Sequence, residues 1–139
     1  MTDGRQRVHV DANVILRLLL GEPEDQAVAA EALFERAAAG NHTIVLHQAV
    51  LAEVIYVLSS PRVASWARAD VVSVLRSVCM LAGVEVADRD VVLDALRMFA
   101  ATRLDWVDCL LLSYTPTMPV YTFDATMLKA GGTSVSRDR

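Results

Sequence analysis

The chain is poor in cysteine and lysine, and it has no long uncharged apolar run. Its 139 residues include two cysteines, Cys79 and Cys109, without the spacing of a disulfide framework, so we expect two buried thiols in a reducing compartment. The polar N-terminus is not followed by an apolar segment, which argues against a signal peptide. Charges such as Glu53 interrupt every apolar run before it could span a bilayer. We therefore expect a cytoplasmic protein.

Positive charge is scarce as well. Thirteen basic residues stand against 17 acidic ones, and the formal net charge is −4. The chain as a whole generates no positive field that would hold a nucleic-acid backbone, so net charge alone argues against a nucleic-acid partner. All basic residues except Lys129 are arginines, the residue better suited to bidentate contacts with phosphate.

The composition is that of a folded domain with apolar residues in excess. Hydrophobic residues make up 54% and charged residues 22% of the chain, which excludes a disordered protein. This length supports one domain that buries roughly two-thirds of its unfolded surface. We expect a single domain over residues 1–139, with a polar tail at 1–6 and a second tail from about 133. The apolar excess predicts a core and, in addition, a surface that another protein covers.

Short apolar strands alternate with helical patterns along the chain. The pattern predicts strands at 7–10, 43–46, 84–86 and 120–123, and helices at 12–20, 24–39, 47–58, 69–82, 88–102, 106–114 and 125–129. The segment after Gly132 forms either an edge strand or a loose tail. This alternation indicates an α/β fold, with a central, mostly parallel sheet of four to five short strands and helices on both faces. Sites in such folds lie outside the carboxyl ends of the strands.

Four acidic residues fall at or near these strand ends. Asp11 and Asp124 follow predicted strands, and Asp108 opens a short helix three residues after Asp105. Each aspartate alone is more simply explained as a helix N-cap. Glu53 differs, because apolar residues surround it within the helix 49–58 and no basic residue lies in the neighbouring turns. We therefore expect Glu53 to be buried, which costs several kcal/mol unless a cation neutralises it.

Taken together, Asp11, Glu53, Asp108 and Asp124 are expected to converge on one edge of the sheet. Clustered carboxylates repel one another and raise their pKa values. Ligands made of oxygen alone select Mg²⁺ or Mn²⁺, whereas the three histidines are too scattered to suggest a zinc site. One or two such ions serve in the cleavage of phosphodiester bonds.

The segments around these acids carry a family resemblance. Val8–Leu16, Leu51–Leu58, Leu104–Leu111 and Val120–Asp124 resemble the PIN-domain nucleases, and most closely the VapC-type ribonuclease toxins of bacterial toxin–antitoxin pairs. The resemblance runs from Val8 to about Gly132. It implies a three-layer fold, a Mg²⁺- or Mn²⁺-dependent endoribonuclease activity, an antitoxin partner of the VapB kind that wraps the N-terminal helices, and a homodimer.

The resemblance also implies roles for single residues. Asp11, Glu53, Asp108 and Asp124 would be the catalytic carboxylates that hold one or two metal ions. Asn13 would support these ligands, Thr122 would brace the last carboxylate by a hydrogen bond, and Asp105 is either a supporting acid or structural. Near the rim, Arg17, Arg62, Arg103 or Lys129 could position the RNA backbone. With four of the 17 acids facing a cation, the net charge no longer argues against RNA.

Two departures from the family pattern and two alternatives remain. Ser113–Pro119 is short and holds two prolines where the family often continues a helix, and Cys109 stands where alanine is common. A phosphotransfer domain of the receiver type would also gather aspartates at strand ends, but the chain has no aspartate at a mid-chain strand end and no lysine that ends the last strand. The other alternative is a non-catalytic PIN-like module that binds protein or RNA, for which the apolar excess argues.

Overall fold

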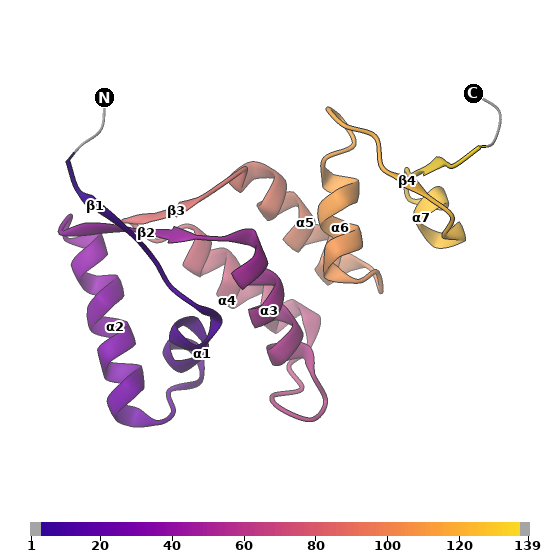
Figure 1. Ribbon diagram of the computed structural model, residues 1–139. Helices are drawn as coiled ribbons and strands as arrows, with labels where there is room; N and C mark the ends of the chain where they lie inside the picture. The colour runs from indigo at the N-terminus through magenta and orange to yellow at the C-terminus, as the bar shows by residue number, and fades with distance from the viewer. Residues whose placement is uncertain (1–3, 137–139) are drawn as a thin grey trace. The chain divides into compact units, whose positions relative to one another are not determined.

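The computed structural model of the protein describes residues 4–136 and divides into two compact units (Figure 1). The N-terminal unit ends at Ala87 and the C-terminal unit begins at Asp88. Residues 1–3 of the predicted N-terminal tail and 137–139 of the predicted C-terminal tail lie outside the described residues. That the two units form one domain stays a prediction.

The N-terminal unit contains a parallel sheet whose strand order is β1-β2-β3. The strands are Gln6–His9 (β1), His42–Leu46 (β2) and Val84–Val86 (β3). Ile44 in the middle strand pairs with Val8 on one side and Val84 on the other. One face of the sheet contributes to the core through buried aliphatic side chains, namely Ile44, Leu46, Val84 and Val86. The alternation of burial along β3 and the end of β2 is what the two-residue period of β-structure requires.

Four helices accompany this sheet. They are Ala12–Leu20 (α1), Glu24–Ala38 (α2), Gln48–Ser59 (α3) and Arg68–Cys79 (α4). α1 packs against α2 and α3, α2 against β2, and α4 against α3 and β3. The helices and the sheet share a core of fully buried aliphatic residues, including Ile15, Leu51, Leu58, Val71 and Leu75.

The C-terminal unit combines three helices with a small second sheet. Its elements are Arg89–Ala101 (α5), Trp106–Ser113 (α6), Tyr121–Thr122 (β4), Ala125–Lys129 (α7) and Thr133–Ser134 (β5). α5 and α6 pack closely, and the rings of Phe99 and Trp106 meet edge to face with centroids 6.2 Å apart, a favourable aromatic geometry. β4 and β5 pair in parallel.

The predicted α/β class and parallel sheet are confirmed, and the architecture is consistent with the predicted three-layer fold. Within residues 4–136 the strands number five, but three belong to one sheet and two to another. For the segment after Gly132 the sequence left an edge strand or a loose tail open, and the structure has a strand there. Both cysteines are buried thiols. No helix in the described part of the chain is long and apolar enough to cross a membrane.

Candidate metal centre

Asp11 stands between the end of β1 and the start of α1. It is exposed, and its Oδ1 accepts a hydrogen bond from the backbone N–H of Val14 at 3.2 Å. This is the N-cap geometry that satisfies one of the free N–H groups of a helix. The other carboxylate oxygen, Oδ2, forms no hydrogen bond within residues 4–136. The capping role is therefore confirmed, and it leaves one oxygen for a further partner.

Glu53 corrects a sequence prediction. Its side chain was expected to be buried, but it is exposed, and no charged or polar residue of the described chain is buried. α3 buries a single stripe made of Leu51, Val54, Ile55 and Leu58, which is the i, i+3, i+4, i+7 pattern of one helix face. Glu53 lies outside that stripe, as does the exposed Tyr56. The desolvation argument for a cation at Glu53 therefore fails, although the glutamate remains accessible to one.

Asp105 and Asp108 occupy the start of α6. Asp105 is the N-cap residue by position, but its side chain makes no capping hydrogen bond. Asp108 lies inside the first turn and is half-buried. The capping explanation, which sequence alone favoured for Asp108, is wrong because the helix begins two residues earlier at Trp106. A carboxylate in the first turn still benefits from the positive end of the helix dipole.

Asp124 caps the short helix α7. Its Oδ1 accepts a hydrogen bond from the N–H of Met127 at 2.9 Å, and Oδ2 has no hydrogen-bond partner among the described residues. Thr122 braces this residue, but not through the carboxylate as predicted. The hydroxyl of Thr122 accepts a hydrogen bond from the backbone N–H of Asp124 at 2.9 Å. The threonine thus fixes the backbone from which the carboxylate projects.

The pKa of Asp108 is raised above its ordinary value. Partial burial is the largest cause, followed by the negative charges of Asp105 and then Asp124. Asp105 and Asp124, which belong to the same unit, are therefore close enough for their charges to act on Asp108. The direction is the one that clustering predicts, but burial contributes more to it than the neighbouring acids do, and the four-residue cluster stays a prediction.

The donor chemistry of these residues suits a hard divalent cation. Asp105, Asp108 and Asp124 offer only oxygen, which Mg²⁺ and Mn²⁺ prefer, and a cation would relieve the repulsion that acts on Asp108. Within residues 4–136, however, no group of three or more His, Cys, Asp or Glu side chains is arranged to hold a metal ion. Asp11 and Glu53 belong to the N-terminal unit, and their convergence with the other acids stays a prediction.

The residues expected around the acids occupy varied positions. Asn13 is exposed in the first turn of α1. Arg17 faces α2, where its Nε donates to Oε1 of Gln26 at 2.8 Å. Arg62 is exposed between α3 and α4, Arg103 is exposed between α5 and α6, and Lys129 is exposed as the last residue of α7.

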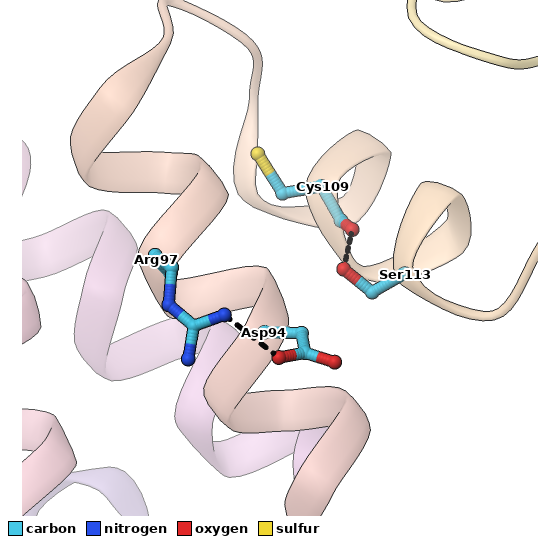
Figure 2. Close-up of polar contacts among 4 residues, drawn as sticks. All are labelled: Asp94, Arg97, Cys109 and Ser113. Carbon is cyan, nitrogen blue, oxygen red and sulfur yellow. Dashed lines mark hydrogen bonds and ion pairs between the residues drawn. The ribbon is translucent and has the colours of Figure 1, made fainter.

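α6 ends at Ser113, before the proline-containing segment. Figure 2 shows the Ser113 hydroxyl turned back to the carbonyl oxygen of Cys109, to which it donates a 2.8 Å hydrogen bond. A serine bond to the carbonyl four residues earlier competes with the helical ladder and is slightly unfavourable to a continuing helix. On the neighbouring helix α5, Arg97 forms a 3.2 Å ion pair with Asp94, and both side chains are largely exposed.

Two polar residues of α2 lie next to Asn13 and Arg17 but were not predicted from the sequence. Gln26 and Arg36 of α2 line a hollow together with Asn13 and Arg17. Their spacing from the buried Phe34 and Ala30 placed them on the edge of the inner face of α2, and that pattern could have drawn attention to them.

Comparison with known families matches residues 8–116 to the PIN domain. No curated protein and no solved structure matches the chain. The matched range contains Asp11, Asn13, Glu53, Asp105 and Asp108, and it ends before Thr122 and Asp124. PIN domains are usually nucleases that use divalent metals and act on nucleic acid. The family match therefore counts for more than the negative net charge, which argued against nucleic acid, and it disfavours a receiver-type phosphotransfer domain. Because the match spans more than half of its length, the chain belongs to the PIN domain family.

Proposed function

We propose that this protein is a Mg²⁺- or Mn²⁺-dependent endoribonuclease. One observation carries the proposal: in a member of the PIN family, the carboxyl of Asp108 is half-buried with Asp105 and Asp124 nearby, and burial first and these charges second raise its pKa. Carboxyl groups whose pKa is raised by burial and by neighbouring like charges are common at functional sites.

Asp11, Glu53, Asp108 and Asp124 are the proposed ligands of one or two ions. When bound, the metal supplies a Lewis acid that activates water and stabilises charge on the leaving oxygen. The chain supplies the orientation. In Asp11 and Asp124, Oδ1 accepts a hydrogen bond from a helix N–H, which orients the carboxylate. Oδ2 of each residue is left to bind a metal ion in the proposal. Asn13, Thr122 and Asp105 support these ligands in the proposal.

The proposed substrate is RNA in the cytoplasm. Arg17, Arg62, Arg103 and Lys129 are candidates for contacts with the phosphate backbone, which position a strand without reading its sequence. Of these, Arg62, Arg103 and Lys129 are exposed, which allows such contacts.

The toxin assignment is part of the same proposal. We infer a VapC-type toxin that is neutralised by a VapB-like antitoxin and forms a homodimer. Large exposed apolar side chains support the need for protein partners: Tyr56, Val63, Val107, Met118, Tyr121 and Phe123 are all more than half exposed. Tyr56 and Val63 belong to the N-terminal unit and the other four to the C-terminal unit, so each unit offers apolar side chains that a protein partner could cover.

The experiment that tests the activity is cleavage of total RNA by the purified chain in Mg²⁺ or Mn²⁺, with the cut sites mapped. Asp108→Asn is expected to reduce cleavage on the order of 100-fold or more, because it removes a charged metal ligand. Asp94→Asn is the matched control, since Asp94 is a helix-surface aspartate paired with Arg97, and it should cleave as the wild type does. Full cleavage by Asp108→Asn, or by the wild type in excess EDTA, would contradict the proposal.

A second candidate is a non-catalytic PIN-like module that binds RNA or protein. It is favoured by the lack of a metal-holding group of three side chains within residues 4–136. The two candidates differ in their response to metal. A ligand that binds only the folded chain stabilises it by about 1.4 kcal/mol at ten times its dissociation constant. A melting temperature that rises with Mn²⁺ in the wild type, but not in Asp108→Asn, supports the nuclease, and an unchanged one supports the module.

A further inference from the structure

A hollow of about 390 Å³ lies between α1 and α2, within the N-terminal unit. Its floor is apolar, with Val14 from α1 and Ala29, Ala30 and Leu33 from α2. The volume falls in the range of sites that hold small ligands or single nucleotides.

The polar groups around this floor are cationic or neutral. Arg17 and Arg36 border the hollow together with the side-chain amides of Asn13 and Gln26, and none of the described lining residues is acidic. The acidic residues of α2 occupy other positions along the helix. In a chain of net charge −4, a hollow with two arginines and no carboxylate is a local exception that favours an anionic occupant.

The two guanidinium groups retain hydrogen-bonding capacity. Arg17 is held in place because its Nε donates to Gln26, while its two terminal nitrogens have no partner within residues 4–136. The Arg36 side chain forms no hydrogen bond or ion pair with the described residues. A guanidinium group with free terminal N–H donors is the preferred protein partner of a phosphodiester oxygen, and its plane can stack on a base.

The hollow adjoins a proposed metal ligand. Val14 forms part of its floor, and the backbone N–H of the same residue donates the hydrogen bond that orients Asp11. Asn13, one residue earlier, lies on its border. An occupant of the hollow would therefore lie against the first turn of the helix that Asp11 caps.

We propose that this hollow seats one nucleotide of the single-stranded RNA that flanks the cleaved bond. Its base lies on the apolar floor, the phosphates on either side contact Arg17 and Arg36, and the amides of Asn13 and Gln26 face the base edge. The inference rests on the proposed nuclease function and assigns Gln26 and Arg36 to substrate recognition. A polypeptide partner is the competing occupant, but the paired guanidinium groups favour a polyanion.

The test is binding of fluorescein-labelled single-stranded RNA to the whole protein in EDTA, measured by fluorescence anisotropy at several salt concentrations. Each phosphate contact to a single strand contributes about 0.7 to the slope of log affinity against log salt, which corresponds to about five-fold in affinity at 0.1 M salt. Arg36→Gln should therefore bind the RNA about five-fold more weakly at 0.1 M salt, with a salt slope smaller by about 0.7. Arg76→Gln is the matched control, because Arg76 is likewise an exposed arginine in the last turn of a helix, here α4, and lies away from the hollow.

A substitution of Arg17 would not be specific for this hollow, because Arg17 also borders a second hollow that contains Glu22. The second test therefore changes a residue of the apolar floor. Ala29→Glu places a carboxylate in the hollow and should weaken RNA binding, whereas Ala38→Glu puts the same charge on an exposed position of α2 that does not line it. Circular dichroism melts verify that each variant is folded.

The outcomes separate this inference from the proposed function. If Arg36→Gln and Ala29→Glu bind RNA with the wild-type affinity and salt slope, the RNA seat is wrong and a polypeptide becomes the better occupant. That result would leave RNA cleavage by the wild type, and its loss in Asp108→Asn, unaffected. If instead the wild type cleaves no RNA, the proposed function fails, even if metal-free binding depends on Arg36.

Discussion

The phenol of Tyr114 donates a 2.6 Å hydrogen bond to Oδ2 of Asp88. Asp88 directly precedes α5 and has a φ of +52°, a backbone conformation that residues other than glycine rarely adopt. Tyr114 directly follows α6. The bond therefore ties the start of one helix to the end of the helix that carries Asp108, and it holds the C-terminal unit together at the point where that unit begins.

Replacing Tyr114 by phenylalanine should lower the free energy of unfolding by about 1 kcal/mol, because one hydrogen bond to a carboxylate near the surface is lost. The measurement is urea denaturation followed by circular dichroism. Tyr121→Phe is the control, since Tyr121 is exposed and its hydroxyl has no partner within residues 4–136. Equal stability of the two variants would show that the Tyr114–Asp88 bond contributes nothing in solution.

The raised pKa of Asp108 predicts how stability depends on pH when no metal is bound. Below its ordinary value of 3.8, the carboxyl is protonated in both the folded and the unfolded chain and contributes nothing. Between 3.8 and the raised folded value, the unfolded chain has lost this proton while the folded chain keeps it. The folded state then binds more protons, so stability falls as the pH rises, and the penalty is complete above the folded pKa.

Asp108→Asn removes this penalty. At pH 7 in EDTA the variant should be as stable as the wild type or more stable, by less than about 1 kcal/mol because the group is only partly buried. Melts between pH 3 and pH 8 should show a smaller decline with pH for the variant. Asp94→Asn provides the contrast, as it removes the ion pair with Arg97 and should not stabilise the protein. A variant that is clearly less stable than the wild type at pH 7 would rule out the electrostatic cost at Asp108.

The local elements were predictable where capping residues and glycines mark them. α1 covers the predicted residues 12–20 because Asp11 caps its start and Gly21, with φ +74°, ends it. α4 ends at Cys79, three residues before the predicted limit. The apolar pattern continues there through Met80 and Leu81, yet both are exposed, so hydrophobicity alone overestimated the helix.

The acids of the candidate site were only partly predictable. The spacing of Asp105 and Asp108 at i and i+3 places them on one helix face, and the resemblance brought Asp124 to them, which the raised pKa of Asp108 supports. Glu53 was misjudged because apolar residues that are not buried, such as Ala49 and Val57, made every face of α3 look like a core face. The hollow between α1 and α2 depends on how two helices pack, which the pattern of either helix cannot reveal.

Gly83 tests a packing constraint at the entry to β3. Its φ is +83°, and a Cβ added there would overlap the backbone carbonyl of Ala37. Gly21 has a similar φ of +74° but nothing within 4 Å of such a Cβ. Gly21→Ala should cost about 1–2 kcal/mol for the left-handed backbone alone, and Gly83→Ala about 2–5 kcal/mol because overpacking adds to it. Thermal melts of the two variants give the comparison, and equal losses would mean that the chain near Ala37 yields freely.

Asp11 allows the structural and the catalytic role of one carboxylate to be separated. Asparagine caps a helix about as well as aspartate, so Asp11→Asn should keep the hydrogen bond to Val14 and leave stability nearly unchanged. Asp11→Ala loses the cap and should cost about 1 kcal/mol. If Asp11 also holds the metal, both variants lose RNA cleavage in Mg²⁺, although only the alanine variant melts at a lower temperature. Retained cleavage in Asp11→Asn would reduce Asp11 to a helix cap, because the substitution removes the negative charge and nothing else that the fold requires.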